Sequence, residues 1–379
     1  MSQRVKIAFV SVIFLSSYRL WSESAKADVQ ILRLLLDQNI GLIVYLAGVA
    51  VVIAAAYTNI GFLRNNFDRN MIYALAAALV VVSVIGFFVG TNPPIDRGPD
   101  HDEATEAWID AFLEGEYPYN PDAHVEFAVE ELTVFPALPV LAFPFYLLYD
   151  VALLMIVGVV TVTYVLLKES RSQRAGALAL TALLLSVPLH YRLVSHSNYV
   201  ELSAMFILGL WFYSSRRPII AGTIFSIVFA MKTNTWPLLP MIAFAVLDRW
   251  NIREIASFAL VGGAIASALL VPFIVWDPYT FFNVAPLDVA SSHQNTFGVS
   301  QTILGIIVVF ATLITYSFTR QLIVGVISGT FVLFLGFPGR YQLFLTVFII
   351  AWAFTKLGIT DEGAESRLGS VYTQITGPP

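Results

Sequence analysis

The stretch EIASFALVGGAIASALLVPFIV, residues 254–275, contains a single charged residue, Glu254. A helix needs about 20 mostly apolar residues to cross the hydrocarbon core of a bilayer, so this stretch predicts a membrane-spanning helix. In the whole chain of 379 residues, 58% are hydrophobic and 12% are charged. A soluble domain carries about 25% charged residues, so this composition indicates a protein whose solvent is largely lipid.

Eleven further windows approach the same length and apolar character. They are residues 5–21, 41–62, 72–91, 150–168, 175–191, 199–214, 218–231, 235–247, 301–318, 321–337 and 341–356. Several are short, and a neighbouring pair such as 218–231 and 235–247 can form a tight hairpin. We therefore expect an all-α polytopic membrane protein with about 10–13 transmembrane helices.

Charge and cysteine content narrow the function classes. The formal net charge is −5, whereas a nucleic-acid-binding protein is expected to carry a basic patch, so we expect no nucleic-acid partner. The chain has no cysteine, which excludes disulfides, thiolate catalysis and cysteine-ligated metals.

The positions of Lys and Arg in the short loops predict the orientation. If the N-terminus is cytoplasmic, most loop cations also fall on the cytoplasmic side. These are Arg64, Arg69, Lys168, Arg171, Arg174, Arg216, Arg217, Arg249, Arg253, Arg320 and Lys356. We expect a plasma-membrane protein with both termini in the cytoplasm. Its parts are N-terminal helices over 1–91, an extracytoplasmic loop over 92–149, a helical bundle over 150–356 and a cytoplasmic tail over 357–379.

The loops predicted to lie outside hold the unusual polar residues. All five histidines, His101, His124, His190, His196 and His293, fall in these loops or at the outer ends of the neighbouring windows. Three outer cations, Lys232, Arg192 and Arg340, depart from the positive-inside bias. A cation in that position indicates an anionic ligand, so the polar asymmetry predicts a functional site on the outer face.

The long loop 92–149 is predicted to contain two interfacial helices. In the first, apolar residues recur at helical spacing opposite an acidic face; they are Ala104, Ala107, Trp108, Ala111 and Phe112. Such a helix lies along the membrane surface, and Gly115 is expected to end it. The second, Thr133 to Tyr149, is apolar but interrupted by three prolines, which predicts an interfacial or re-entrant helix.

The sequence GPDHDE, residues 98–103, opens the first of these helices. One interpretation is a helix start, with Asp102 as N-cap and Glu103 favoured by the helix dipole. Another is a carboxylate fixed at the membrane surface as a general base, and the two are compatible. Asp100, His101 and Asp102 can also hold a hard divalent cation such as Mg²⁺ or Mn²⁺, although we expect no required cofactor.

The order of these features resembles the GT-C superfamily of membrane glycosyltransferases. The resemblance rests on the acidic pair, on LEGEYPYNP (113–121), on FPALPVL (135–141) and on MKTNTWPLLP (231–240). Asn198 and Glu201 open one window, Arg216 and Arg217 form a turn before Ala221 and Gly222, and Pro338 to Tyr341 open the last window. The nearest likeness is to polyprenyl-phosphate-sugar-dependent hexosyltransferases and to protein O-mannosyltransferase and aminoarabinose transferase relatives.

The resemblance implies transfer of a sugar from a polyprenyl-phosphate or dolichol-phosphate donor to an acceptor hydroxyl on the outer face, with inversion. The acceptor is a glycan, a lipid or a protein. Asp102 is then the general base, with Glu103 and Asp100 beside it, and Lys232, Arg192 and Arg340 bind the donor phosphate. The expected substrate-cavity residues are His101, Glu201, Asn198, Tyr117, Tyr119 and His196.

Other interpretations stay open at this point. A secondary transporter or lipid flippase for a lipid-linked saccharide is the main alternative, although it predicts inverted repeats and midplane charges that the sequence lacks. A non-catalytic assembly subunit is another. For single residues, Lys232 can simply extend from a helix end to the interface, and Tyr117 and Tyr119 can belong to an aromatic belt.

Overall fold

The computed structural model describes residues 69–91, 101–120, 134–283, 300–336 and 338–358. Within these ranges the chain is helical, and the only extended pairing is an isolated bridge between Ser170 and Thr355. The expectation of an all-α membrane protein is thereby confirmed. The windows 5–21 and 41–62 lie outside the described residues, as do Asp100, His124, His293 and the tail beyond residue 358.

The helices follow the apolar windows closely. They are α5 (Arg69–Thr91), α6 (His101–Leu113), α7 (Ala137–Leu148), α8 (Leu153–Glu169), α9 (Gln173–Leu184), α10 (Val187–Val194), α11 (Tyr199–Ser214), α12 (Pro218–Met231), η3 (Thr233–Leu238), α13 (Leu239–Arg249), α14 (Ile252–Trp276), α15 (Pro278–Asn283), α17 (Gln301–Thr319), α18 (Leu322–Gly336), α19 (Pro338–Phe354) and η4 (Lys356–Gly358).

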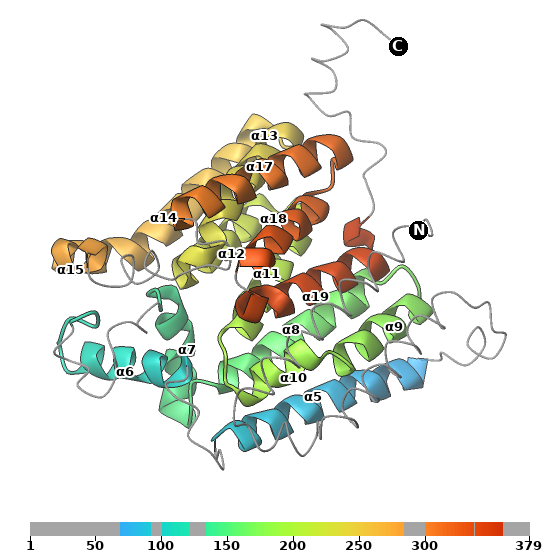
Figure 1. Cartoon of the computed structure of the whole chain (residues 1–379), viewed down its shortest axis with the longest axis horizontal. Helices are drawn as coiled ribbons and strands as arrows, with labels where there is room; N and C mark the ends of the chain where they lie inside the picture. Colours follow the sequence, from blue (N-terminus) through green and yellow to red (C-terminus); the bar gives the residue numbers. More distant parts are fainter. Residues whose placement is uncertain (1–68, 92–100, 121–133, 284–299, 337, 359–379) are drawn as a thin grey trace, which may run out of the picture.

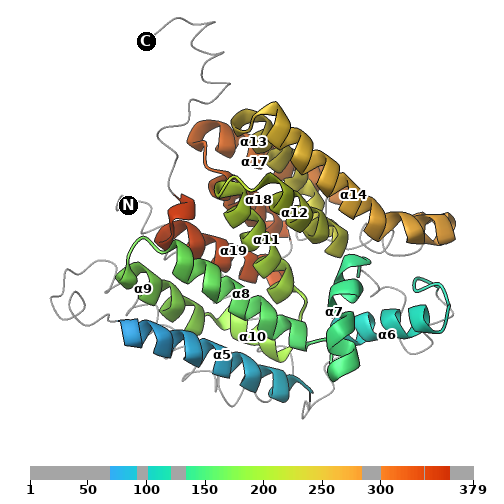
Figure 2. The same ribbon diagram turned by 180° about the vertical axis from the view of Figure 1, so that it is seen from behind.

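The helices form two groups joined through α11 and α19 (Figures 1 and 2). One group contains α5, α8, α9 and α10, and the other contains α12, α13, α14, α17 and α18. Helix α11 packs against α8 on one side and α12 on the other, while α19 packs against α18, α11 and α9. Because α11 touches both groups, the residues at its two ends have neighbours from many parts of the chain.

Two of the described helices, Ile252–Trp276 and Thr302–Thr319, are long and apolar enough by themselves to cross a membrane. Six further apolar helices have 10–17 residues. Helices α7 and α8 satisfy the same criterion only as a pair, and they meet at an angle of 114°. A chain that turns so sharply cannot continue straight through the bilayer. The angle agrees with an α7 that lies along the membrane interface and an α8 that is closer to the membrane normal. The predicted total of 10–13 spans stays a prediction.

Two apolar windows are not single helices. The window 235–247 is divided between the 3₁₀ helix η3 and α13. The window 175–191 breaks between α9 and α10, so the prediction of one continuous span there is wrong. At the break, the Ser186 hydroxyl accepts a hydrogen bond from the Leu189 backbone N–H at 3.3 Å. Pro188 lies in the first turn of α10, where its missing backbone N–H is tolerated. The capping serine and the proline together start a new helix.

The amphipathic helix predicted in the long loop is present as α6. It begins at His101, so Asp102 lies inside its first turn, and the expectation that Asp102 is the N-cap is wrong. The helix ends as predicted, because Gly115 adopts a left-handed conformation with φ of 79°. There the Glu116 N–H donates to the Ala111 carbonyl at 2.9 Å, as in a glycine-terminated helix.

Aromatic side chains hold α6 and its tail against the end of α14. The Trp108 and Phe273 ring centroids lie 5.0 Å apart, and the Tyr117 and Trp276 rings lie 5.5 Å apart. The Tyr117 hydroxyl also donates to the backbone carbonyl of Phe273 at 3.0 Å. Tyr119 is fully buried, and its hydroxyl donates to the Val134 carbonyl at 2.9 Å. These contacts fix the loop that carries Asp102.

The proline-containing stretch forms α7, with Pro144 inside the helix. Its start is tied to the end of α12, because the Phe135 N–H donates to the Met231 carbonyl at 3.3 Å. Its Tyr146 hydroxyl donates to Asp110 on α6. The corner between α7 and α8 contains Asp150, whose carboxylate accepts the Ala152 N–H at 2.7 Å. The bend therefore brings Asp150 next to α6.

Candidate active site at one end of α11

His196 is the centre of the first polar cluster. It lies between α10 and α11, its side chain is 2% exposed, and its backbone is left-handed with φ of 42°. The imidazole Nδ1 is 2.5 Å from the Asp102 Oδ2, and Nε2 is 3.0 Å from the Phe87 carbonyl oxygen. The Phe87 ring stacks on the imidazole at 5.5 Å with an interplanar angle of 12°. Three elements, α5, α6 and the α10–α11 loop, thus fix one imidazole.

The partners of His196 determine its protonation. A backbone carbonyl only accepts hydrogen bonds, so Nε2 carries a proton. Nδ1 faces a carboxylate at 2.5 Å, which needs a proton between the two atoms. Burial opposes the charged form, but the hydrogen bond and the charge of Asp102, together with the Phe87 carbonyl, hold the pKa of His196 above its usual value. These contacts favour the protonated, charged form of His196.

Asp102 has one oxygen held and one available. Its Oδ2 is bound by His196, while its Oδ1 is buried without a hydrogen-bond partner among the described residues. The first turn of α6 favours a negative charge at this position because of the helix dipole. A carboxylate that is fixed through one oxygen can present the other to a hydroxyl group. This is the geometry that a general base requires.

Two further carboxylates, Asp150 and Glu106, join the cluster. Asp102, Asp150 and His196 each place a ligand atom within 4.8 Å of the other two. Burial, followed by the charges of Asp150 and Asp102, raises the pKa of Glu106 to about 7. Burial also raises the pKa of Asp150, with Asp102 adding to the effect. The single imidazolium therefore balances a group of carboxylates that repel one another.

The same three residues are the one group in the described part of the chain that could hold a metal ion. A cation ligated by His196 needs a free lone pair on an imidazole nitrogen. Here Nε2 faces a carbonyl, and the 2.5 Å between Nδ1 and Oδ2 leaves no room for an ion. Metal binding would require the pair to separate. The arrangement therefore fits a hydrogen-bonded ion pair better than a metal centre.

Lys232 is the centre of a second cluster, in which positive charge gathers around Tyr199. The Lys232 Nζ lies 4.4 Å from the centre of the Tyr199 ring, and the Arg192 guanidinium carbon lies 5.0 Å from it. Lys232 also donates to the Asn198 Oδ1 at 3.1 Å. Lys232 is 3% exposed, and its backbone is extended between α12 and η3. A buried ammonium is costly unless polar partners or a counter-ion stabilise it.

The start of α19 reaches the same cluster. Tyr341 packs edge-on against Tyr199 with ring centroids 6.2 Å apart, and Phe344 lies 5.7 Å from the same ring. Arg340 directly precedes Tyr341 in the first turn of α19. The fold therefore brings the chain positions of Lys232, Arg192 and Arg340 together, although they are far apart in sequence.

Glu201 links the two clusters. It is buried in the first turn of α11, within electrostatic range of His196, Asp102 and Lys232. Its Oε2 and the Asn198 Nδ2 have no hydrogen-bond partner among the described residues. Unsatisfied donors and acceptors are rare in a protein interior and need a reason. Their concentration beside both clusters marks this end of α11 as the place for a polar ligand.

The structure thus unites most of the predicted site residues. Asp102, His196, Glu201, Asn198, Lys232 and Arg192 form one continuous polar region, whereas Tyr117 and Tyr119 are buried and use their hydroxyls to hold the loop. Glu103 is exposed, and His101 is the first residue of α6. Sequence reasoning missed Glu106 and Asp150. The four-residue spacing from Asp102 to Glu106 was an available signal, because residues i and i+4 share a helix face.

A membrane-embedded helical bundle with a carboxylate–imidazolium pair and a cluster of cations at one end, beside a surface helix, has the parts of an enzyme acting at a bilayer surface. The chain belongs to glycosyltransferase family 87, which matches residues 119–370, more than half of its length. This is a GT-C-type family of membrane glycosyltransferases, so the resemblance predicted from the sequence is confirmed. The match includes His196, Glu201 and Lys232 and begins after Asp102. No curated protein and no solved structure matches the chain.

Proposed function

We propose that this glycosyltransferase moves a sugar from a polyprenyl-phosphate donor to an acceptor hydroxyl on the extracytoplasmic face of the plasma membrane. The observation that carries the proposal is the Asp102–His196 pair, with Oδ2 held and Oδ1 available, and His196 lies three residues before Tyr199, around which the cations gather. The orientation follows from the cationic loops assigned to the cytoplasm.

The proposed reaction is a single displacement with inversion at the anomeric carbon. The acceptor oxygen attacks that carbon while its proton passes to Asp102 Oδ1, and the bond between the sugar and the phosphate oxygen breaks. The imidazolium of His196 holds the carboxylate in place, and Glu103 and Asp100 add negative charge nearby. His101 completes this acidic segment.

Lys232, Arg192 and Arg340 are proposed to bind the donor phosphate. Negative charge grows on the leaving phosphate in the transition state, and cations fixed beforehand stabilise that charge. Asn198 positions Lys232 through the 3.1 Å hydrogen bond, and Glu201 faces the sugar between the two clusters. The bent α7, whose outer side chains are apolar, is proposed to guide the lipid tail of the donor. Tyr117 and Tyr119 have a positional role through the loop.

The test measures sugar transfer by the purified full-length protein in liposomes. Each liposome sample receives one radiolabelled sugar donor, either a polyprenyl-phosphate sugar or the matching nucleotide sugar, with mannose tested first. We expect label to reach the acceptor from the polyprenyl-phosphate sugar alone. Transfer from the nucleotide sugar would contradict the proposed donor. Label that crosses the bilayer still attached to its lipid, without transfer, would instead favour a flippase.

A further inference from the structure

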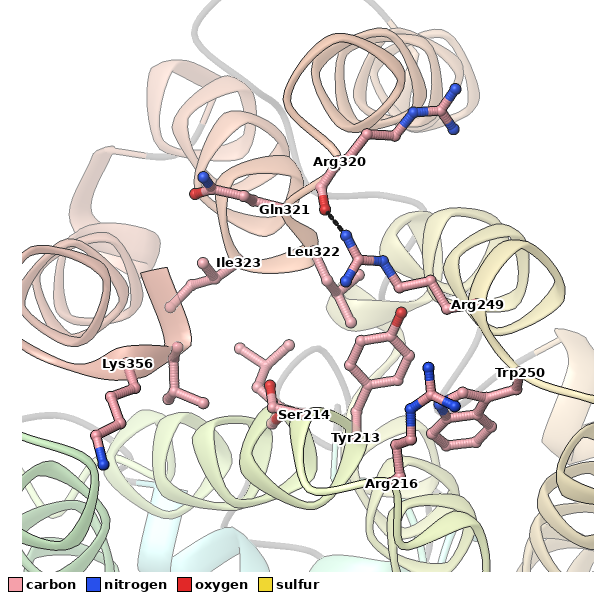
Figure 3. Close-up of a pocket in the computed structure, with 12 residues that line it drawn as sticks. Tyr213, Ser214, Arg216, Arg249, Trp250, Arg320, Gln321, Leu322, Ile323 and Lys356 are labelled. Carbon is pink, nitrogen blue, oxygen red and sulfur yellow. Dashed lines mark hydrogen bonds between the residues drawn. The ribbon is translucent and has the colours of Figure 1, made fainter. Parts of the chain in front are cut away.

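A second polar recess lies at the opposite end of α11, about 24 Å away if its 16 residues rise 1.5 Å each. Twelve described residues line it: Leu210, Tyr213, Ser214, Arg216, Arg249, Trp250, Arg320, Gln321, Leu322, Ile323, Lys356 and Leu357. Four of the twelve are cations and none is acidic. They come from four separate places: the turns after α11 and α17, the last residue of α13 and the start of η4 (Figure 3).

The two arginines nearest the aromatic wall face the recess. In Figure 3 the guanidinium groups of Arg216 and Arg249 lie beside Tyr213 and Trp250, and Arg249 donates to the Arg320 carbonyl. The Tyr213 and Trp250 rings stack at 5.2 Å with an angle of 28° and form a firm wall. Arg320 turns its own side chain away, where it pairs with Asp248 at 3.3 Å. The recess thus combines two guanidinium groups with an aromatic wall.

The backbone at this end is unusual. Three non-glycine residues in the described part of the chain have a left-handed backbone, and they are His196, Arg216 and Arg320. Glycine or asparagine normally fills such positions after a helix, because a Cβ is disfavoured there. His196 belongs to the candidate active site, and the other two line this recess. Disfavoured backbone conformations gather where function fixes a side chain.

The position of the recess relative to the membrane-spanning helices indicates which part of the bilayer it contacts. Arg249 and Trp250 lie three and two residues before α14, and Arg320 directly follows α17. Among the described helices, these two are long and apolar enough to cross a membrane alone. If these two helices cross the bilayer, the recess at their ends lies at the level of the lipid headgroups. The guanidinium group matches phosphate oxygens in a two-pronged geometry.

We propose that this recess binds the phosphate headgroup of an anionic phospholipid. Capping of helix C-termini by cations explains single arginines at these helix ends, but it does not explain why Arg216 and Arg249, from two separate helix ends, place their guanidinium groups in one recess. Basic recesses between membrane helices on the cytoplasmic side are suited to anionic headgroups. The site is independent of the proposed sugar donor, which is assigned to the other end of α11.

The test compares neighbouring residues that differ in whether they line the recess. Arg216→Gln removes a lining cation, while Arg217→Gln removes the same charge one residue later, outside the lining. Arg249→Gln keeps a donor for the Arg320 carbonyl and is matched by Arg253→Gln on α14. Native mass spectrometry of the detergent-purified full chain measures binding of phosphatidylglycerol, with phosphatidylcholine as the neutral reference.

We expect phosphatidylglycerol to bind the wild-type protein at least about tenfold more tightly than phosphatidylcholine. Arg216→Gln should remove most of this preference, while Arg217→Gln and Arg253→Gln should retain it. Arg216 is exposed, so its variant folds even if Arg249→Gln does not. Equal losses in Arg216→Gln and Arg217→Gln would overturn the proposal, because they would show general charge attraction. Equal competition by millimolar glycerol phosphate would also overturn it, because the ligand would then be a soluble phosphate.

Discussion

The two ends of α11 differ in the sign and the burial of their charged side chains. At the Asp102 end, both signs are present and the key groups are buried, with the His196 side chain 2% and Lys232 3% exposed. At the Arg216 end, the recess is lined by one sign of charge, and Arg216 and Lys356 are exposed. Buried opposite charges fix a geometry, because each holds its partner in place. Exposed like charges attract an anion without fixing one another. The first arrangement suits chemistry and the second suits binding.

The largest expected difference between the two ends of α11 is in the rate of sugar transfer after one lysine is replaced at each end. Lys232→Met keeps the length of the side chain but removes the charge proposed to stabilise the leaving phosphate. We expect the transfer rate at saturating donor to fall by about 10²–10³-fold, as for loss of a fixed group that stabilises developing charge. Lys356→Met at the other end should leave the rate unchanged. A Lys232→Met enzyme with a near-normal rate would remove the cation cluster from the mechanism.

The next largest expected effect is on protein stability, where α12 packs closely against α14 near the Arg216 end of α11. A Cβ added at Gly222 on α12 would lie 2.6 Å from the Phe258 carbonyl oxygen on α14, whereas one added at Gly263 on α14 would meet nothing within 4 Å. Gly222→Ala should therefore destabilise the protein by about 1–3 kcal/mol, and Gly263→Ala should not. Thermal unfolding in detergent measures the difference. Transfer per folded molecule should persist in Gly222→Ala, since the Asp102 end is untouched.

A smaller effect is expected from pH at the Asp102 end. The pKa of Glu106 is raised to about 7, so the folded state favours its neutral form, and that contribution to stability is lost as pH rises through 7. The raised pKa of His196 acts in the same direction. Thermal stability should fall as pH rises from about 4.5, the ordinary pKa of a glutamate, to about 7, the pKa of Glu106 in the folded protein.

Glu106→Gln isolates this effect. The glutamine should reduce the fall in the free energy of unfolding with pH by about 1 kcal/mol. The effect is no larger because the Glu106 side chain is half exposed and solvent screens its charge. Glu114→Gln, on the exposed part of the same loop, should reproduce the wild-type dependence. An unchanged pH dependence in Glu106→Gln would mean that neither burial nor the charges of Asp150 and Asp102 raise the pKa of this carboxyl group.

The smallest expected effect is that of a chelator. The hydrogen bonds of both His196 nitrogens leave no lone pair for a metal, so we predict transfer that does not depend on a divalent cation. EDTA should change the rate by less than about twofold, a small free-energy difference. Loss of transfer that Mn²⁺ or Mg²⁺ restores would instead assign a metal to Asp102, Asp150 and His196.

Much of the fold was predictable because lipid imposes a simple rule on sequence. Apolar length alone located α5, α8, α11, α12, α14, α17, α18 and α19 to within a few residues. The break before α10 was missed because the window 175–191 remains apolar on both sides of it, and only Ser186 and Pro188 indicate a new helix start. With Asp102 as N-cap, α6 would begin at Glu103, two residues after its actual start at His101, which is within the usual uncertainty at helix ends.

The sequence predicted which residues belong to the candidate site, but not which of them contact one another. Sidedness and residue type selected Asp102, His196 and Lys232, yet no spacing predicts that His196 would bind Asp102 across 94 positions. Asp150 could not be found from sequence, since only the 114° turn between α7 and α8 brings it to α6. Tyr117 and Tyr119 were predicted to line the substrate cavity, but they are buried and hold the loop. A tyrosine in an outer loop can serve packing as well as binding, so residue type alone could not decide between the two roles.

The most direct test of the account is the rate of sugar transfer by Asp102→Asn. The amide keeps the shape of the side chain but cannot take a proton from the acceptor hydroxyl. At saturating polyprenyl-phosphate donor, we predict a rate about 10²–10⁴-fold below wild type, while Glu114→Gln transfers normally and both variants unfold near the wild-type temperature. A folded Asp102→Asn protein that transfers sugar within about threefold of wild type, a difference of less than 1 kcal/mol, would contradict the central claim.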